Sequence, residues 1–255
     1  MYDIVAIPAF EDNYIWALHN DQHAFVVDPG DAAPVLAWLA RNNISLSGML
    51  CTHRHHDHVG GIEELRAVYN VPVYGRQHKK NPHITHDLRE GDKLSLEEFG
   101  LNFDIMEVPG HIEDHIAYYS SGSGILFCGD VLFGAGCGRN FEGSVKELHH
   151  SLQRFASLPP STLAYCAHEY TASNLRFAKV CDPMNPDVDH RIERTAQMRA
   201  VNQSTVPFTI EIELATNPFL RCKEPAILHS LRQAGYDAID EESAFIALRE
   251  WRDKF

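Results

Sequence analysis

The sequence lacks the features that mark several large classes of protein. None of its 6 cysteines belongs to a C-x-x-C pair, and so few cysteines in a chain of this length make a disulfide framework improbable. No apolar run reaches the ~18 residues that a membrane-spanning helix requires. Asp3, Glu11 and Asp12 interrupt the first residues, where a signal peptide would carry a basic start and an apolar core. A cytoplasmic protein is therefore expected.

Positive charge is also scarce. The chain has 22 Lys and Arg residues against 35 Asp and Glu residues, for a formal net charge of −13. This balance argues against nonspecific binding to nucleic acid or to an anionic membrane. An anionic substrate would therefore need a local basic patch. Repeats, low-complexity segments and Gly/Ser-rich linkers are absent as well, and 255 residues can bury a substantial core in one large or two modest domains.

The first two-thirds of the chain alternate short apolar runs with turns. The predicted strands are Asp3–Ile7, Tyr14–Leu18, Ala24–Asp28, Gly48–Cys51, Val71–Tyr74, Asn102–Val108, His115–Tyr119, Ile125–Cys128 and Leu163–Cys166. The predicted helices are Ala33–Arg41, Ile62–Tyr69 and Val145–Leu158. Ser144 and Glu147 form a capping box for the last of these. Many strands with few helices between them indicate sheets layered against helices rather than a doubly wound parallel sheet.

After about residue 170 the pattern becomes helical. The predicted helices are Asn174–Cys181, Val188–Asn202, Pro225–Gln233 and Glu242–Lys254. Proline-containing loops separate them. The last third of the chain is therefore predicted to form a helical subdomain.

The most informative segment is Thr52–Gly61, with the sequence THRHHDHVGG. Neutral imidazoles and carboxylates are ligands that zinc, iron and manganese accept. Without a metal, so dense a polar cluster would be costly to bury. A solvated loop is a weaker interpretation, and so is a structural zinc, which favours cysteine and a closed coordination shell.

Further candidate ligands end three other predicted strands, at His111, Asp130 and His168. Loops at strand ends can converge on one site while the sheet holds them rigid. Each residue alone would more often be an ordinary strand-end residue, but together with the first cluster they predict one metal centre. His115 begins an apolar run and is expected to be a core or supporting imidazole. The histidines expected to face solvent from helices are His149, His150 and His190.

The pattern H-x-H-x-D-H after a strand resembles the signature of the metallo-β-lactamase superfamily. The resemblance is closer to glyoxalase II, the hydroxyacylglutathione hydrolases, and it runs over almost the whole chain. The segments that carry it, besides the metal motif, are Ile7–Tyr14, Val27–Gly30, Cys128–Asp130, Gly136–Gly143, Ala167–Thr171, Asn217–Phe219 and Leu248–Phe255.

This resemblance implies an α+β fold, a four-layer αββα sandwich over residues 1–168 followed by a helical substrate-binding domain over residues 169–255. It also implies two divalent metal ions per chain, expected to be Zn²⁺, with Fe or Mn as alternatives. The ligands of the first ion would be His53, His55 and His111. Those of the second would be Asp57, His58 and His168, with Asp130 bridging both. Alternate side chains of an extended segment point the same way, as His53 and His55 would, whereas Asp57 and His58 must lie on a turn.

Three residues depart from the motifs of the family. Ile112 replaces the usual threonine after the Pro-Gly-His segment, and Asp114 replaces the glycine before the next histidine. Arg54 stands where bacterial members often have histidine. None of the three is an expected ligand, but the hydrogen bonds around the ligands should differ here.

By resemblance, the reaction is hydrolysis of S-(R)-2-hydroxyacylglutathione, typically S-D-lactoylglutathione, to a 2-hydroxy acid and glutathione. A hydroxide shared by the two ions would attack the thioester carbonyl, with Asp57 and Asp130 as catalytic residues. A thiolate, with a solution pKa of about 8.5, can leave without a dedicated proton donor.

Glutathione carries two carboxylates, so cationic side chains should flank the cleft. The residues expected by resemblance to bind substrate are Arg139, Phe141, Tyr170, Arg249 and Arg252. The alternative for the last two arginines is a solvated helix face beside Glu250 and Asp253. The protein is expected to be a monomer without a nucleic-acid or membrane partner.

Two other functions remain open from the sequence. The first is another enzyme of the superfamily, such as a lactamase, a lactonase or a glutathione persulfide dioxygenase. The second is a metal-stabilised binding or scaffold protein without turnover, whose metal would be fully coordinated. Metal content combined with a panel of thioester, lactam and persulfide substrates would distinguish them.

Overall fold

The computed structural model describes every residue from Met1 to Phe255. The chain forms two compact units, each assembled from two stretches of sequence. The first unit consists of Met1–Val108 and Asp114–Gly129. The second consists of Pro109–Glu113 and Asp130–Phe255.

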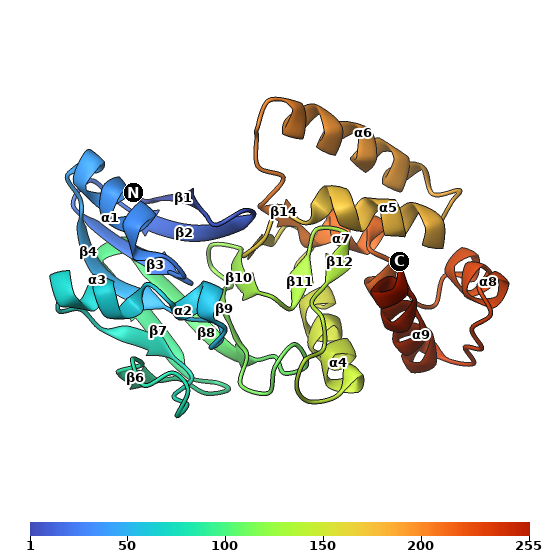
Figure 1. Ribbon diagram of the computed structural model, residues 1–255, viewed down its shortest axis with the longest axis horizontal. Coiled ribbons are helices and arrows are strands. Elements are labelled where there is room, and N and C mark those ends of the chain that lie inside the picture. Colours follow the sequence, from blue (N-terminus) through green and yellow to red (C-terminus); the bar gives the residue numbers. More distant parts are fainter. The chain divides into compact units, whose positions relative to one another are not determined.

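The first unit contains two sheets (Figure 1). Its strands are β1 (Asp3–Ala9), β2 (Asn13–His19), β3 (His23–Val27), β4 (Ser45–Leu50), β5 (Val73–Gly75), β6 (His86–Asp87), β7 (Lys93–Leu96), β8 (Leu101–Glu107), β9 (Ile116–Ser120) and β10 (Ile125–Gly129). Its helices are α1 (Ala32–Asn42), α2 (His56–Val59), α3 (Ile62–Val68) and the 3-10 turn η1 (Glu97–Phe99). The first sheet has the order β1-β2-β3-β4-β5-β6, antiparallel from β1 to β3 and parallel from β3 onward. Strands β10, β9, β8 and β7 are consecutive antiparallel neighbours in the second.

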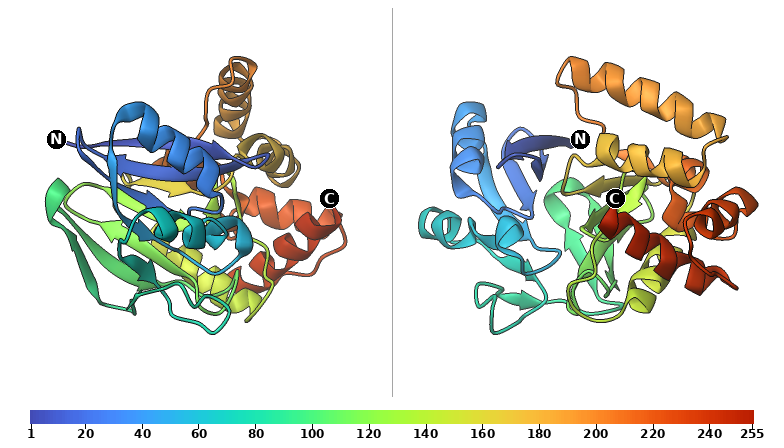
Figure 2. Two further views of the ribbon diagram at one scale, coloured as in Figure 1. Left: turned by 60° about the vertical axis from the view of Figure 1, so that its left-hand side comes forward. Right: turned by 45° about the vertical axis from the view of Figure 1, so that its right-hand side comes forward.

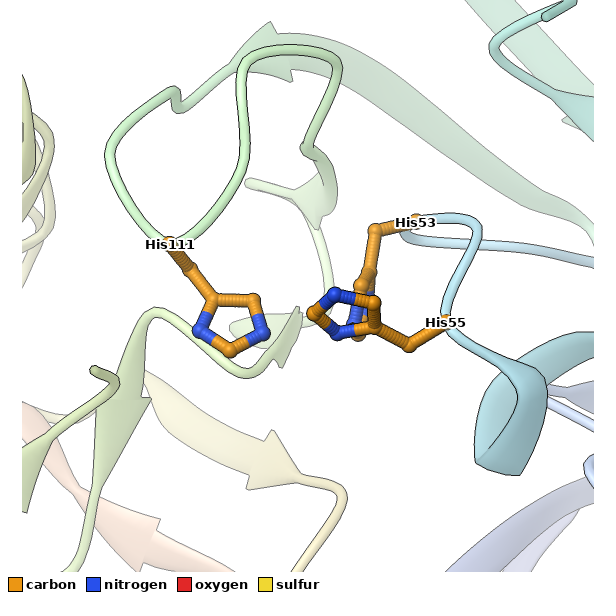
Figure 3. A group of neighbouring side chains, drawn as sticks. All are labelled: His53, His55 and His111. Carbon is orange, nitrogen blue, oxygen red and sulfur yellow. The ribbon is translucent and has the colours of Figure 1, made fainter. Parts of the chain in front are cut away.

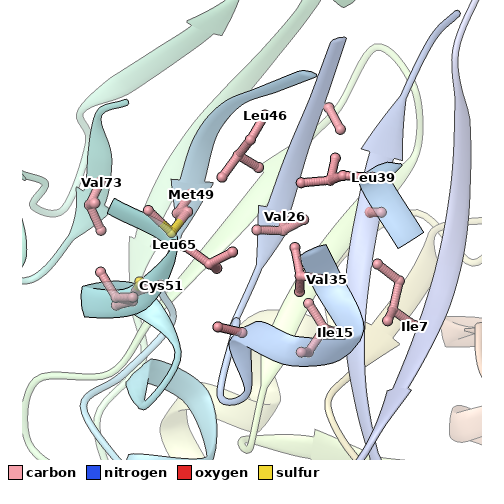
Figure 4. Packing of buried hydrophobic residues seen from close by; sticks show 14 of the residues in the cluster. Ile7, Ile15, Val26, Val35, Leu39, Leu46, Met49, Cys51, Leu65 and Val73 are labelled. Carbon is pink, nitrogen blue, oxygen red and sulfur yellow. The ribbon is translucent and has the colours of Figure 1, made fainter. Parts of the chain in front are cut away.

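Helices α1 and α3 cover one face of the first sheet (Figures 1 and 2). Val35 and Leu39 of α1 and Leu65 of α3 are fully buried against Val26 and Met49 (Figure 4). Each such side chain contributes about 1.5–3 kcal/mol by leaving water. The spacing of these residues along each helix therefore explains why the helices lie on the sheet.

The other face of the first sheet meets the second sheet. The Tyr118 hydroxyl of β9 lies 3.0 Å from the carbonyl oxygen of Cys51 and 3.1 Å from that of Tyr74. Phe25 of β3 packs edge-to-face on Phe99, with ring centroids 6.0 Å apart. The first unit is thus a helix layer and two sheet layers.

The second unit is mainly helical. Its strands are β11 (Leu132–Phe133), β12 (Gly136–Cys137), β13 (Leu163–Cys166) and β14 (Phe208–Thr209). Its helices are α4 (Val145–Ala156), α5 (Thr171–Cys181), α6 (Pro186–Ala200), α7 (Ile210–Thr216), η2 (Pro218–Leu220), α8 (Pro225–Gln233) and α9 (Glu241–Lys254). Phe219 joins its helices, because its ring lies 6.0 Å from Phe177 of α5 and 5.7 Å from Phe245 of α9.

Every predicted strand and helix is present, and the Ser144–Glu147 capping box begins α4 as expected. The elements absent from the prediction are short, apart from α7. The sequence IEIEL at the start of α7 alternates apolar and charged residues as a strand would. The Thr209 side chain instead accepts a hydrogen bond from Ile212 N at 3.3 Å and caps a helix.

The prediction for His149 was wrong. Its side chain is buried rather than solvated, and its ring stacks on Phe245 with centroids 4.7 Å apart. His150 and His190 are exposed and His115 is buried, as expected. All the cysteines are free and buried. None of the helices combines the length and apolar character of a membrane span.

Candidate metal centre

The donor residues of the first unit follow β4. His53 and His55 lie on the extended segment after this strand (Figure 3), whereas Asp57 and His58 lie on the first turn of α2. His53 Nε2 is 3.0 Å from His55 Nδ1. Two nitrogens bound tetrahedrally to one zinc ion would lie about 3.3 Å apart. His58 Nε2 is 3.3 Å from Asp57 Oδ2. The segment therefore presents two donor pairs.

A carboxylate that the sequence did not identify as part of the site orients two of these histidines. Asp28, with a φ of 54°, follows β3 and accepts hydrogen bonds from Thr52 N at 2.7 Å and from the Thr52 hydroxyl at 2.7 Å. It also lies 3.1 Å from His58 Nδ1. The Thr52 hydroxyl has given its hydrogen to Asp28, so it accepts from His53 Nδ1, 3.1 Å away. Both histidines thus carry hydrogen on Nδ1 and present the lone pair of Nε2 to a metal.

Two further residues fix Asp57. Asn13 Nδ2 donates to Asp57 Oδ2 at 3.1 Å. A Cβ at Gly30 would lie 1.9 Å from the Asp57 carbonyl oxygen, so only glycine allows this close approach. The Asp57 side chain remains 41% exposed. Its carboxylate is therefore oriented and still accessible.

The second unit carries the remaining predicted donors, His111, Asp130 and His168, and all are buried. Each oxygen of Asp130 faces a different histidine: Oδ2 is 3.6 Å from His111 Nε2, and Oδ1 is 3.4 Å from His168 Nε2. His111 Nδ1 donates to the Arg139 carbonyl at 2.8 Å, which leaves Nε2 as the donor atom. This arrangement suits a bridging carboxylate.

The loop after β8 that carries His111 (Figure 3) is held by α4. Ser151 of this helix donates to the Pro109 carbonyl at 2.7 Å. Gly110 has a φ of 133°, and a Cβ there would lie 2.3 Å from the Leu148 Cα. Any other residue would be strained in its backbone and would clash with α4. The Pro-Gly-His sequence thus sets the position of His111.

A cavity of about 370 Å³ in the second unit lies next to these donors. This volume falls in the range of about 300–1,000 Å³ typical of small-molecule sites. Its lining includes two predicted metal ligands and every residue predicted to bind substrate: His111, Asp130, Arg139, Phe141, Tyr170, Arg249 and Arg252.

The arginines of the cavity differ in exposure. Arg249 is only 6% exposed, and its Nη1 is 3.3 Å from the Cys137 carbonyl oxygen. Arg139 is 63% exposed and lies 3.5 Å from Asp253, which also accepts from Arg249 at 3.0 Å. Burial lowers the pKa of Arg252, and the neighbouring Arg249 adds to this effect. The cavity is therefore cationic within an acidic chain, and Arg249 does not lie on a solvated face.

Aromatic rings flank the buried histidines. Tyr170 stacks on His168 with centroids 4.7 Å apart and planes 9° apart. Phe141 meets His111 edge-on at 5.2 Å and is 60% exposed. These rings restrict the imidazoles and provide apolar surface to a ligand.

The donor set fits divalent metal ions. A histidine whose second nitrogen is held by a hydrogen bond can present its other nitrogen to a metal, and the nearby carboxylates are hard donors. Zinc, iron and manganese all accept such ligands. The buried setting favours an occupied site, because bound cations would offset the cost of burying these groups.

Comparison with known proteins first defines the class. Residues 10–168 match the family model described as the metallo-beta-lactamase superfamily, and the chain belongs to this superfamily. A solved structure described as BLEG-1 B3 metallo-beta-lactamase is 24% identical, with a TM-score of 0.63 over 86% of this chain and 99% of that one. The predicted αββα fold is confirmed.

The particular family follows from the rest of the chain. Residues 169–255 match the model described as the hydroxyacylglutathione hydrolase C-terminus. Hydroxyacylglutathione hydrolases of Nitrosomonas eutropha and Nitrosomonas europaea are 51% and 47% identical over this whole chain, covering 100% and 97% of their own lengths. The chain belongs to the hydroxyacylglutathione hydrolase, or glyoxalase II, family, as predicted.

Proposed function

We propose that this protein hydrolyses S-(R)-2-hydroxyacylglutathione thioesters, typically S-D-lactoylglutathione, to a 2-hydroxy acid and glutathione. This is the second step of methylglyoxal detoxification. The observation that carries the proposal is one cavity lined by both His111 and Asp130 and by three arginines. It combines donors for a hydrolytic metal with cations for the two carboxylates of glutathione. The names of the similar relatives support the same reaction.

The proposed metal ligands follow the donor pairs within each unit. His53, His55 and His111 would hold the first ion, Asp57, His58 and His168 would hold the second, and Asp130 would serve both. The 3.0 Å separation of His53 and His55 supports a shared ion, as does the 3.3 Å separation of Asp57 and His58. The opposed contacts of the two Asp130 oxygens support the bridge. Zn²⁺ is the ion we expect, with Fe or Mn as alternatives.

Divalent ions in this donor set supply a water of lowered pKa and a Lewis acid for the thioester carbonyl. The protein orients the reactants around them. Asp57, held by Asn13 and 41% exposed, can accept a hydrogen bond from the attacking water. The leaving thiolate needs no proton donor, because its solution pKa is about 8.5.

The substrate is oriented by the cavity. Arg139, Arg249 and Arg252 attract the glutathione carboxylates, while Phe141 and Tyr170 pack against the thioester chain. In this proposal residues 1–168 supply the catalytic part and 169–255 the substrate-binding part. A monomer acting in the cytoplasm, without nucleic-acid or membrane partners, also remains our prediction.

The test combines metal analysis of the purified protein with hydrolysis of S-D-lactoylglutathione. Two equivalents of a divalent metal and metal-dependent hydrolysis are expected. Asp130→Ala should lose metal and abolish turnover. Asp104→Asn, on β8 and 44% exposed, is the control and should behave as the unaltered protein.

A β-lactam, a lactone and glutathione persulfide should be poor substrates in the same assay. Faster turnover of any of them than of the thioester would assign the chain another activity of the superfamily. A tightly metallated protein that turns over none of the four would instead be a binding protein.

A further inference from the structure

A neighbouring segment, residues 114–116, contacts the metal-donor segment in the first unit. Ile116 N donates to the Thr52 carbonyl at 2.9 Å. His53, the residue after Thr52, stacks on His115, the residue before Ile116, with ring centroids 4.7 Å and planes 18° apart. Residues 52 and 53 thus meet residues 116 and 115 in opposite order, so that the second segment fixes the first.

The next pair in this register is Arg54 and Asp114, and their side chains form an ion pair. These side chains are only 8% and 15% exposed. His53 and His55 project to one side of the extended segment, so Arg54 between them projects to the other. The ion pair therefore holds the segment from behind its two donor residues.

The pair also has an electrostatic role. A guanidinium between two metal ligands repels a divalent cation, and this repulsion is strong where water is largely excluded. The Asp114 carboxylate neutralises it. In addition, His55 precedes α2 as its N-cap residue and makes no side-chain capping hydrogen bond, so capping does not fix the start of this helix.

We propose that Arg54 and Asp114 form a positioning pair, which directs His53 and His55 toward a metal ion and keeps the local charge neutral for it. This inference rests on the ligand set proposed above. It also makes two of this chain's departures from the family motifs a matched pair rather than two independent changes.

The test measures the zinc dissociation constant of the full-length protein by competition with a chelator. Arg54→Gln and Asp114→Asn should each weaken zinc binding about 10–100-fold, as loss of a residue that orients ligands does. Asp114→Asn should weaken zinc binding more, because it removes the negative charge that offsets the Arg54 guanidinium near the metal ion. The double variant should bind zinc more tightly than the product of the two single-variant losses in affinity predicts, because it removes both charges of the pair at once.

Three controls separate positioning from general stabilisation. Lys93→Gln removes an exposed ion pair of the same unit, Lys93 with Asp104 at 2.8 Å, and should leave zinc affinity unchanged. Arg54→Lys keeps the charge and should recover most of the affinity. Thermal unfolding of the metal-free forms reports folding independently of zinc, and the two Arg54 variants suffice if Asp114→Asn does not fold.

Single variants with unaltered zinc affinity, or with effects that are simply additive, would overturn the positioning pair and leave the proposed function intact. An unaltered protein that binds no zinc, iron or manganese would overturn both.

Discussion

At the scale of single residues, Asp28 contacts the donor set without being one of its predicted ligands. It contacts His58 directly and His53 through Thr52. A histidine ligand is effective only when its other nitrogen is held by a partner that fixes the tautomer and the ring. Asp28 therefore prepares donors that belong to different proposed ions.

We predict that Asp28→Asn lowers metal affinity about 10–100-fold, because an amide cannot accept from every donor that the carboxylate satisfies. Chelator competition measures this loss. Asp31→Asn changes the same groups at the cap of α1, where asparagine is an equally good cap, and should have no such effect. Equal metal affinity in both variants would contradict the role of Asp28.

Replacing Arg252 and replacing Arg249 should have different effects on KM and on stability. Arg252→Ala should raise KM for the glutathione thioester about tenfold, the equivalent of ~1.4 kcal/mol, with little change in kcat. Arg249→Ala should raise KM and also lower the melting temperature, because Arg249 is buried and donates to the Cys137 carbonyl.

Steady-state kinetics and thermal unfolding measure these two effects. Arg232→Ala, an exposed change on α8, is the control. If Arg252→Ala lowered kcat without changing KM, this arginine would act in the chemical step rather than in binding.

At the scale of elements, the contact of α4 with α9 should depend on pH. Burial against Phe245 lowers the pKa of His149 from its ordinary value of 6.5, although Glu241 and Glu242 oppose the shift. As pH falls below 6.5, the unfolded chain takes up this proton before the folded protein does. The free energy of unfolding is therefore unaffected by protonation of His149 well above pH 6.5, and it decreases as the pH falls below 6.5.

Chemical denaturation at several pH values between 5 and 8 tests this expectation. The loss of stability on acidification should be smaller in His149→Gln than in the unaltered protein. His150→Gln replaces the exposed neighbour and should keep the original slope. Parallel slopes in all three proteins would show that His149 does not contribute.

The elements that could be predicted were those with a clear period or cap. The strands around β2 and β3 are buried apolar runs, and the Ser144–Glu147 box marks the start of α4. Helix α7 could not be predicted, because its alternating pattern favours a strand until Thr209 caps it. The burial of His149 was missed since its partner, Phe245, lies 96 residues further along the chain.

For the candidate site, the spacing predicts the donor residues but not the residues that orient them. H-x-H-x-D-H predicts ligands because the residue types themselves bind metals. Asp28 acts through Thr52 and His58, contacts that exist only after β3 and β4 are paired. Its one local signal was an aspartate before Pro-Gly at the end of a strand, which also reads as an ordinary turn.

At the scale of the molecule, one buried charge links several parts of the second unit. Glu213 of α7 is fully buried, accepts from Ala135 N at 2.9 Å and from Asn217 Nδ2 at 2.8 Å, and pairs with Arg191 of α6. Burial raises its pKa, while Arg191 opposes the shift. Removal of this carboxylate leaves a buried guanidinium without its counter-ion.

Glu213→Ala should therefore cost about 3–5 kcal/mol of unfolding free energy. Urea denaturation measures it, and Glu211→Ala, exposed on the same helix, should change stability by less than about 0.5 kcal/mol. If Glu213→Ala lowered the free energy of unfolding by less than about 1 kcal/mol, Arg191, Ala135 N and Asn217 would not depend on this carboxylate for their hydrogen bonds.

The position of Asp28 has a consequence for how the protein would gain and lose the two proposed metal ions. Because one carboxylate anchors donors assigned to different ions, disturbing it should empty both positions together. Intermediates with a single ion should then be scarce during chelation. The two proposed ions would then leave together, because Asp28 orients donors of both.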